Sequence, residues 1–301
     1  MLYNNLSEYF RQKYGQRIKK ICIDGGFSCP NRDGKCGTGG CIYCGERGAG
    51  EHITARISIR EQVLATLANS KPTDKFVAYF QNFSNTYASV EVLKERYDEA
   101  LIDERIVALA VGTRPDCIDE DKVRLIAEYQ KKVDVWVELG LQTSNDKTAE
   151  VINRGYPRSV FEKAVELLKK YSIPTVVHMI IGLPGEDKAD ATATAKYISS
   201  LDVWGVKIHS IYVMKNTSLA EMYEKNLYTP PTLSEFCEIC AECVGNISKS
   251  MTVHRLTGDC PRDLLLAPEW NKNKNEILDG VRKEMEKRSI SQGSLLHSIE
   301  Q

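Results

Sequence analysis

The stretch VDVWVELG (133–140), followed by VFEKAVELLKKY (160–171) and TVVHMIIG (175–182), decides the fold class. The two outer runs are apolar nearly throughout, which is typical of strands buried on both faces. The middle run places its apolar residues at helical spacing. A strand, a helix and a second strand in this order predict two parallel strands joined by a right-handed crossover.

The same alternation extends over residues 18–213. Further strands are expected at 18–24, 76–80, 106–112 and 206–213, and further helices at 59–70, 90–100, 120–131 and 188–201. Six strand–helix units predict an α/β protein, either an incomplete (β/α) barrel or an open sheet. Beyond this core at 1–215, the sequence becomes charged and mainly helical. We therefore expect a C-terminal helical extension at 216–301 within the same structural unit.

Composition is that of a globular protein with a sizeable core: of the 301 residues, 42% are apolar and 27% are charged. The sequence has no run of about eighteen uncharged apolar residues, so we expect no membrane span. Its N-terminus is polar and lacks the apolar core of a signal peptide, which predicts a cytoplasmic protein. Clustered cysteines in that compartment usually indicate metal binding or catalysis. Because the net charge is only −1, a nucleic-acid partner would need a local basic patch.

Four cysteines, at positions 29, 36, 41 and 44, lie in a glycine-rich loop at 25–50, directly after the first strand. Active sites of parallel α/β folds form at such strand-end loops. Cys41 and Cys44 form a tight CxxC pair, and Cys29 is the natural third ligand. Three thiolates would leave one iron of a four-iron cluster open for a substrate or cofactor. The alternative is a structural zinc site closed by all four sulfurs.

Two blocks, CPNRDG (29–34) and GGCIYC (39–44), resemble the cluster loop of radical SAM enzymes, in the subgroup similar to the catalytic subunit of Elongator. The chain resembles the bacterial YtqA/YhcC-type radical SAM proteins more closely. Further matching blocks are YFQNFSNTYA (79–88), GTRPDC (112–117), VELGLQT (137–143), INRGY (152–156), IIGLPGE (180–186) and HRLTGDCPRDLL (254–265). The resemblance implies a partial (β/α)6 barrel of the TIM type. It also implies S-adenosylmethionine and a [4Fe–4S] cluster held by Cys29, Cys41 and Cys44, with Cys36 a bystander.

Several residues are candidates to bind this cofactor. By position in the family pattern they are Tyr43 near the adenine, Gln81, Ser84 and Asn85 near the methionine amino group, and Ile180 and Gly182 near the adenine. Glu138 and Gln142 could bind the ribose or the amino acid, and burying Glu138 without a partner would be costly, so we expect it to face outward or to bind a ligand. The Arg154 guanidinium matches a carboxylate bidentately, although an ordinary salt bridge would explain it equally well.

The catalytic residues are not determined by the sequence. The candidates are Tyr87, His178, His209, Arg255 and Asp259, although either histidine could equally be a core residue. Arg255 and Asp259 belong to a polar group with Thr257 and Arg262 that could line the substrate side.

A second set of cysteines lies in the C-terminal part, at positions 237, 240, 243 and 260. CxxCxxC followed by Cys-Pro occurs in ferredoxins and would mean an auxiliary cluster. The first three cysteines also fall at helical spacing with apolar neighbours, and cysteine behaves as a small apolar residue on such a face. We therefore expect them to pack in the core.

The resemblance implies a tRNA substrate, in which the carboxymethylaminomethyl side chain at C5 of the wobble uridine is converted towards aminomethyl. It also implies an electron donor such as flavodoxin or ferredoxin. Basic segments at 12–20, 271–275 and 281–288 could contact phosphates, although the last also suits a helix with i,i+4 ion pairs. Two alternatives remain: a radical SAM enzyme acting on a protein or small molecule, and a zinc-stabilised, non-catalytic RNA-binding protein.

Overall fold

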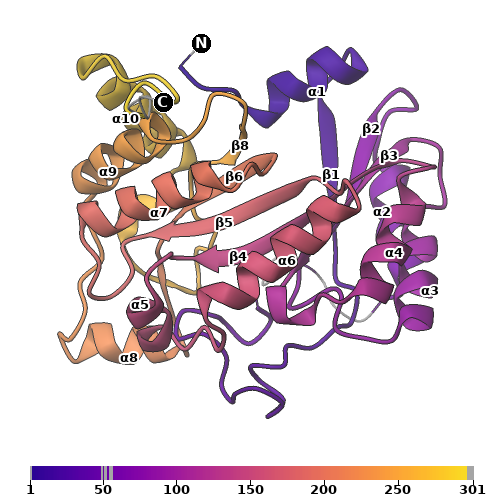
Figure 1. The fold of residues 1–301 in the computed structure, drawn as a ribbon, viewed down its shortest axis with the longest axis horizontal. Coiled ribbons are helices and arrows are strands. Elements are labelled where there is room, and N and C mark those ends of the chain that lie inside the picture. Colours follow the sequence, from indigo (N-terminus) through magenta and orange to yellow (C-terminus); the bar gives the residue numbers. More distant parts are fainter. Residues whose placement is uncertain (1, 49, 51–52, 54–56, 297–301) are drawn as a thin grey trace.

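The computed structural model describes residues 2–48, 50, 53 and 57–296, and its main body is a curled, parallel sheet wrapped by helices (Figure 1). The seven strands of this sheet lie in the order β1-β2-β3-β4-β5-β6-β8. Their bounds are β1 Ile18–Ile23, β2 Lys75–Phe80, β3 Ile106–Thr113, β4 Asp134–Gln142, β5 Thr175–Ile181, β6 Gly205–Ser210 and β8 Thr252–Arg255. Every pairing is parallel, and the sheet is a partial barrel of the TIM type, as predicted.

Helices follow the strands in the expected alternation. The helices are α1 Leu6–Tyr14, α2 Ile59–Ala68, α3 Val90–Ala100, α4 Glu120–Tyr129, α5 Asp146–Val151, α6 Arg158–Lys170, α7 Lys188–Ser200, α8 Ser218–Glu224, α9 Leu233–Gly245 and α10 Lys274–Lys287. Two short 3₁₀ helices lie at Pro115–Cys117 and Glu269–Lys272, and a small antiparallel pair joins β7 Val213–Met214 to β9 Leu265–Ala267. Most helices cover the outer face of the sheet (Figure 1).

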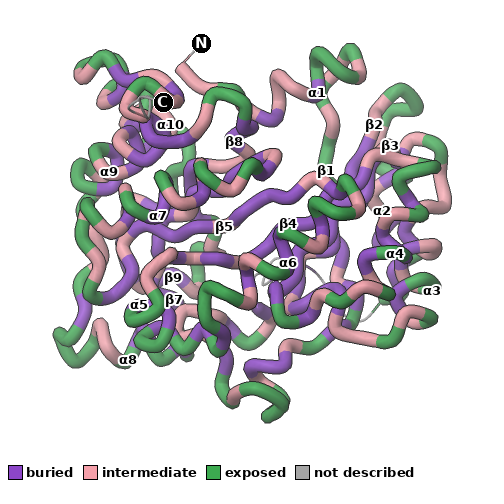
Figure 2. The backbone as a smooth tube through the Cα atoms, viewed as in Figure 1, coloured by how far each residue is buried: buried purple, intermediate pink, exposed green. Residues whose placement is uncertain are grey.

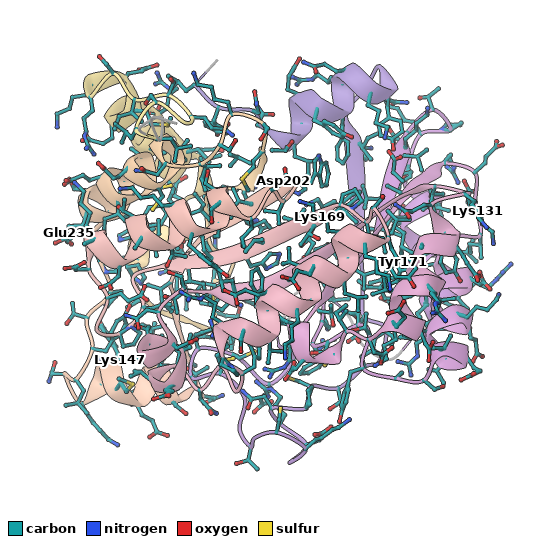
Figure 3. All side chains as sticks on the ribbon, in the orientation of Figure 1. Lys131, Lys147, Lys169, Tyr171, Asp202 and Glu235 are labelled. Carbon is teal, nitrogen blue, oxygen red and sulfur yellow. The ribbon has the colours of Figure 1, made fainter. Side chains whose placement is uncertain are left out.

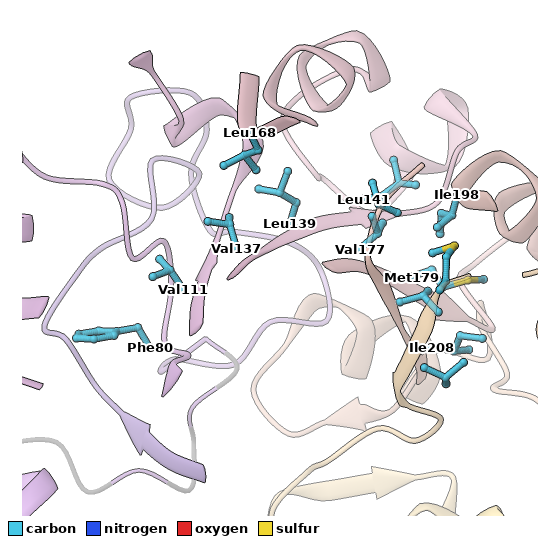
Figure 4. Close-up of a cluster of buried hydrophobic side chains, with 14 of the residues drawn as sticks. Phe80, Val111, Val137, Leu139, Leu141, Leu168, Val177, Met179, Ile198 and Ile208 are labelled. Carbon is cyan, nitrogen blue, oxygen red and sulfur yellow. The ribbon is translucent and has the colours of Figure 1, made fainter. Parts of the chain in front are cut away.

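Each strand divides its residues between two faces, because successive side chains point in opposite directions. On β5, Val177, Met179 and Ile181 pack outward into the main hydrophobic core with the helices (Figure 4). The residues between them, such as His178 and Ile180, face the interior of the barrel and line a cavity there. The apolar runs therefore combine an outer face that forms the core with an inner face that carries polar groups.

One end of the barrel interior is filled by α1, which the sequence analysis did not predict. Leu6 and Phe10 of this helix lie one turn apart and pack against inward-facing residues such as Val77 and Trp136. The helix contacts both edge strands of the sheet, β1 and β8. Because α1 covers the apolar part of the interior, the cavity is confined to the other end of the strands.

The C-terminal part contributes a seventh strand to the sheet, which corrects the prediction of six. The strand predicted at 206–213 ends earlier, at Ser210, and is β6. The strand β8 pairs with β6 and forms the edge of the sheet. Thr252–Arg255 is short and half polar, so it carries no strand signal of its own and depends on pairing with β6.

Three of the four cysteines of the C-terminal set lie in the main hydrophobic core, as predicted. Cys237, Cys240 and Cys243 are buried on α9 within the same cluster as Phe236 and the outward face of the sheet. Cys260 is separate from them and lines a polar pocket near the end of β8. We propose that residues 216–301 and the barrel form one folding unit, because α9, α10 and β8 share this core.

The outer surface is polar and ion-paired. Exposed residues concentrate on the outer faces of the helices, while the strands are buried (Figure 2). Typical surface pairs are Lys169–Asp202 at 2.9 Å and the Tyr171 hydroxyl with Glu120; Lys169, Tyr171 and Asp202 are labelled in Figure 3. Such pairs stabilise a protein little because water screens them. Among the described residues, no helix has the length and apolarity needed to cross a membrane.

Phe236→Ala tests whether the C-terminal extension folds with the barrel. Phe236 is fully buried, so the substitution should lower the free energy of unfolding by about 3–5 kcal/mol. Urea denaturation followed by circular dichroism should show one transition at a lower midpoint. Leu227→Ala is the control, because Leu227 is 71% exposed and should change little. Two separate transitions, with only one of them shifted, would contradict a single unit.

Candidate active site

A cavity of about 710 Å³ occupies the barrel interior above α1. Its wall includes residues of all seven strands of the main sheet, together with the loop between β1 and α2. Cys29, Cys41 and Cys44 all line it, and Tyr43 lies beside them. This volume is in the range that encloses a ligand of cofactor size. The cysteine loop and the polar floor of the barrel therefore face the same space.

The cysteine loop has little regular structure and is held by side chains from its own sequence. Arg32 donates a hydrogen bond to the carbonyl oxygen of Cys44 at 2.9 Å. Asn31 donates to the carbonyl oxygen of Asn153 at 2.6 Å, and a side chain at Gly37 or Gly155 would collide with Asn31. These two glycines are therefore needed for the close approach of the loop to the INRGY segment.

The INRGY segment (152–156) braces the cysteine loop from the other side. Asn153 adopts a left-handed conformation, with φ of 53°, and donates to the carbonyl oxygen of Gly40 at 2.7 Å. The amide N–H of Ile42 donates to the carbonyl oxygen of Ile152 at 3.1 Å. The INRGY segment, more than 100 residues further along the chain, thus fixes the backbone immediately before Cys41 and Cys44.

Arg154 lines the cavity, but its guanidinium is engaged by the same bracing segment. Its guanidinium is buried and donates to the carbonyl oxygens of Leu141, Thr143 and Tyr156 at 2.7–3.0 Å. A fourth hydrogen bond goes to the Asp146 carboxylate at 2.9 Å. Because four of its five N–H donors are occupied by protein groups, Arg154 is unsuited to receive a bidentate carboxylate.

The donor set of the loop fits an iron–sulfur cluster. Burial raises the pKa of the Cys41 thiol to about 12, and the nearby Cys44 and Cys29 contribute to the rise. Iron binding would remove that proton and neutralise the thiolate. Three thiolates that line one cavity could each bind a different iron of a four-iron cluster and leave the fourth iron open.

The floor of the cavity is organised by one buried carboxylate, that of Glu138 on β4. Its Oε2 accepts hydrogen bonds from His178 Nε2 and from the Tyr79 hydroxyl, both at 2.8 Å, and forms an ion pair with Lys207 Nζ. Its Oε1 accepts from Trp136 Nε1 at 3.0 Å. The expectation that Glu138 faces outward or binds a ligand is therefore wrong, because protein side chains from four strands satisfy it.

The pKa values of this group follow from burial and charge. Burial alone would raise the pKa of the Glu138 carboxyl, but Lys207 and His178 hold it well below its usual range. Burial lowers the pKa of the Lys207 ammonium to about 7, although Glu138 opposes the shift. Burial also lowers the pKa of His178 and that of His209. Both histidines are thus neutral near pH 7, and Nε2 of His209 is buried without a protein partner.

The structure brings most of the predicted cofactor residues to the cavity. Tyr43, Gln81, Ser84, Gln142 and Ile180 all line it. These residues remain our proposal for the cofactor contacts, together with the backbone around them.

Two predicted cofactor residues lie elsewhere. Asn85 is fully buried, does not line the cavity and donates to the carbonyl oxygen of Gly112 at 2.6 Å, so it ties the loop after β2 to β3. Gly182 has a φ of 93°, and a side chain there would collide with Ile211 and Pro231. This glycine is therefore explained by tight packing beneath the loop and not by an approach to the adenine.

Four of the five catalytic candidates line the cavity: His178, His209, Arg255 and Asp259. The two histidine rings are 5.1 Å apart, centroid to centroid. Tyr87 is not among the lining residues; it is half-buried, and the Lys35 ammonium lies 5.0 Å from its ring centroid. A catalytic role for Tyr87 is therefore not supported.

Sequence reasoning missed much of the cavity wall, including Lys20, Cys22, Tyr79 and Lys207. The signal was present for the two lysines, because each interrupts an otherwise apolar strand. A charged residue in a buried strand must face a partner or a ligand.

The fold and the site together define the family. The sequence model of the radical SAM superfamily matches residues 34–198, more than half of the chain, and that of the radical SAM C-terminal domain matches residues 203–287. The chain therefore belongs to the radical SAM superfamily. Its cofactors are the ones this superfamily uses, a [4Fe–4S] cluster and S-adenosylmethionine.

Among individual proteins, the chain is 36% identical to YtqA of Bacillus subtilis over 99% of this chain and 94% of that protein. It is 29% identical to a tRNA uridine(34) acetyltransferase of Methanocaldococcus jannaschii, over 62% of this chain and 34% of that larger protein. The solved structure of Elp3 from Methanocaldococcus infernus matches with a TM-score of 0.67 at 23% identity, over 78% of this chain and 59% of that one. The predicted resemblance to YtqA-type and Elongator-like radical SAM proteins is confirmed.

Replacing Cys29, Cys41 or Cys44 with alanine should abolish cluster assembly, because each thiolate binds its own iron. Anaerobically reconstituted protein should contain close to four irons per chain, and each variant much less; the variants should also form no 5′-deoxyadenosine. Cys36→Ala is the matched control from the same loop and should keep both properties. Cofactor cleavage retained in any of the first three variants would contradict this ligand set.

Glu138→Gln should destabilise the protein by about 3–5 kcal/mol, because it leaves the Lys207 ammonium buried without its counter-charge. Urea denaturation at pH 7 measures the loss. In the double variant Glu138→Gln/Lys207→Met the uncompensated charge is gone, so part of the stability should return. Glu150→Gln, at an exposed position on α5, is the control. A double variant as unstable as the single one would show that charge pairing is not the cause.

Proposed function

We propose that this protein modifies the C5 side chain of the wobble uridine of tRNA, converting carboxymethylaminomethyl towards aminomethyl. The observation that carries the proposal is one cavity with cluster-type cysteines at its mouth and buried cationic side chains at its floor. Similarity to a protein named tRNA uridine(34) acetyltransferase supports a wobble uridine as the target, although that similarity covers only part of either chain. The resemblance to YtqA-type proteins supports the same substrate.

A second pocket supports an RNA substrate. It has a volume of about 410 Å³ and shares Arg255 and Asp259 with the main cavity. Thr257 and Arg262, from the polar group singled out in the sequence, also line it, as do Lys272 and Lys274. Cationic side chains in this position could hold the phosphates that flank a base inserted into the main cavity.

The other basic segments support RNA binding less well. Arg282 and Lys283 of α10 both pair with Asp279, at 2.6 and 2.7 Å. Lys19, near the start of β1, pairs with Asp74. The segment at 281–288 is thus an ion-paired helix surface, and the phosphate contacts are assigned to the second pocket.

In this function the cluster and S-adenosylmethionine, once bound, would supply a 5′-deoxyadenosyl radical that takes a hydrogen atom from the carbon between the amine and the carboxylate. Loss of one electron from that carbon to the redox partner would give an imine, and water would split its C–N bond to release aminomethyluridine and glyoxylate. The protein's own residues do the rest. The braced cysteine loop fixes the position of the cluster, the barrel wall excludes water, and the charged floor orients the substrate. We also propose a cytoplasmic location and an electron donor of the flavodoxin or ferredoxin type.

Reaction of the reconstituted protein with tRNA tests the function. The substrate is tRNA that carries carboxymethylaminomethyluridine at position 34, incubated with S-adenosylmethionine and dithionite. Nucleoside mass spectrometry should show its conversion to aminomethyluridine, with 5′-deoxyadenosine formed in step. The Cys41→Ala variant is the control. Formation of 5′-deoxyadenosine that does not respond to tRNA, with no change in the nucleoside, would favour a protein or small-molecule substrate.

The second pocket yields a separate prediction for binding. Arg262→Ala combined with Lys274→Ala should weaken tRNA binding at physiological salt and reduce the salt dependence of the affinity by about one logarithmic unit per lost phosphate contact. Filter binding over a salt series measures both. Lys283→Ala/Lys287→Ala on α10 removes the same charge from ion-paired positions and should change neither. An equal effect of both pairs would mean that net charge matters, not this pocket.

A further inference from the structure

A lysine without a counter-charge lies in the barrel cavity. Lys20 is the third residue of β1, and the strand's alternation turns it inward: Ile21 and Ile23 pack in the outer core, and Lys19 pairs with Asp74 outside. Lys20 counts as exposed by surface area, yet it lines the cavity, and burial lowers the pKa of its ammonium. The part of the Lys20 side chain that solvent can reach therefore forms part of the cavity wall.

The charges around Lys20 do not balance it. Within the described part of the chain, no carboxylate lies within ion-pair distance of Lys20, and its ammonium lies 5.4 Å from the Tyr79 ring centroid. The other two cations of the floor have partners, since Lys207 pairs with Glu138, and Arg255 with Asp259 at 3.4 Å. Burial is the largest cause of the lowered Lys20 pKa; the charge of Glu138, which is already paired with Lys207, opposes the shift in part, and Arg255 and Lys274 add to the lowering. Of these three cations at the floor, Lys20 is therefore the one with which no carboxylate of the described residues forms an ion pair.

An ammonium kept from bulk water without a counter-ion is costly, and an anionic ligand would remove that cost. The depth at which Lys20 lies in the cavity indicates which anionic ligand it would bind. A strand rises about 3.3 Å per residue, so Lys20 lies roughly 10 Å below the end of β1 at Ile23, where the chain leads into the cysteine loop. The cluster and the amino acid that binds it belong at that loop, whereas Lys20 faces the deeper part of the cavity.

We propose that Lys20 determines substrate specificity by binding a carboxylate of the substrate, with Arg255 from the opposite edge strand completing an anion subsite. This inference rests on the proposed function, in which the side chain to be shortened ends in a carboxylate. The product would end in an amine that is cationic near neutral pH. Lys20 would repel that amine, so the same residue selects the substrate and disfavours the product.

The test compares Lys20→Gln with Lys19→Gln, which removes the same charge from the outward face of the same strand. The probes are two anticodon stem–loops that differ only at the wobble uridine, one with carboxymethylaminomethyl and one with aminomethyl. Wild-type protein should bind the first at least tenfold more tightly, as a charge-assisted hydrogen bond implies. Lys20→Gln should lose most of this preference, Lys20→Arg should restore part of it, and Lys19→Gln should keep it.

A second readout separates this role from cofactor binding. Lys20→Gln should form 5′-deoxyadenosine without RNA at the wild-type rate, since its carboxylate partner belongs to the substrate. Loss of that activity would overturn the inference and assign Lys20 to the carboxylate of S-adenosylmethionine. An unchanged preference in Lys20→Gln would overturn it while leaving the proposed function intact. Wild-type protein that neither discriminates between the stem–loops nor converts the first would overturn the proposed function, and the carboxylate assignment with it.

Discussion

The buried carboxylate of Glu138 is the constraint on which the interior of this barrel depends. It accepts hydrogen bonds or an ion pair from residues of β2, β4, β5 and β6. A carboxylate removed from water is tolerated only when donors surround it, so its presence fixes which inward-facing residues must meet. The network holds four strands around an open space that apolar side chains do not fill. The cavity lies beside this network, because polar side chains and not apolar ones line its floor.

The two faces of the sheet have separate tasks. The outward face and the helices form a continuous hydrophobic core, which extends into α9 and α10 and supplies stability. The inward face has α1 packed at one end and the cavity at the other. A parallel sheet with both faces covered allows this division, because every second residue of a strand is free to serve the site without weakening the core.

The cysteine loop shows how an irregular segment becomes rigid. Its described residues, 25–48 and 50, form no helix or named strand, and its shape comes from Asn31 and Arg32 within the loop and from the INRGY segment outside it. Arg154 fixes that segment in turn through three backbone carbonyls and a carboxylate. Cluster ligands must be held closely in place to leave one iron open, and a supporting layer of hydrogen bonds meets this need. Polar residues that resemble cofactor ligands in the sequence can thus instead hold the backbone of the site in place.

The sequence by itself determined the alternation of strands and helices and the cysteine pattern, because periodicity and short motifs are local properties. The partial barrel and the cofactor class followed from the resemblance of its sequence blocks to radical SAM proteins. The sequence also placed Cys237, Cys240 and Cys243 in the core from their helical spacing. The tertiary structure alone decided that Glu138 meets Lys207, 69 residues further along the chain, and that Lys20 faces the cavity without a counter-charge. It likewise added α1 and β8 to the barrel. The helix α1 has its own caps at Asn5 and Gly15, but its place in the interior comes from the packing of Leu6 and Phe10, and the short, half-polar β8 depends on pairing with β6. Burial and charge pairing depend on which segments the fold brings together, and no local pattern contains that information.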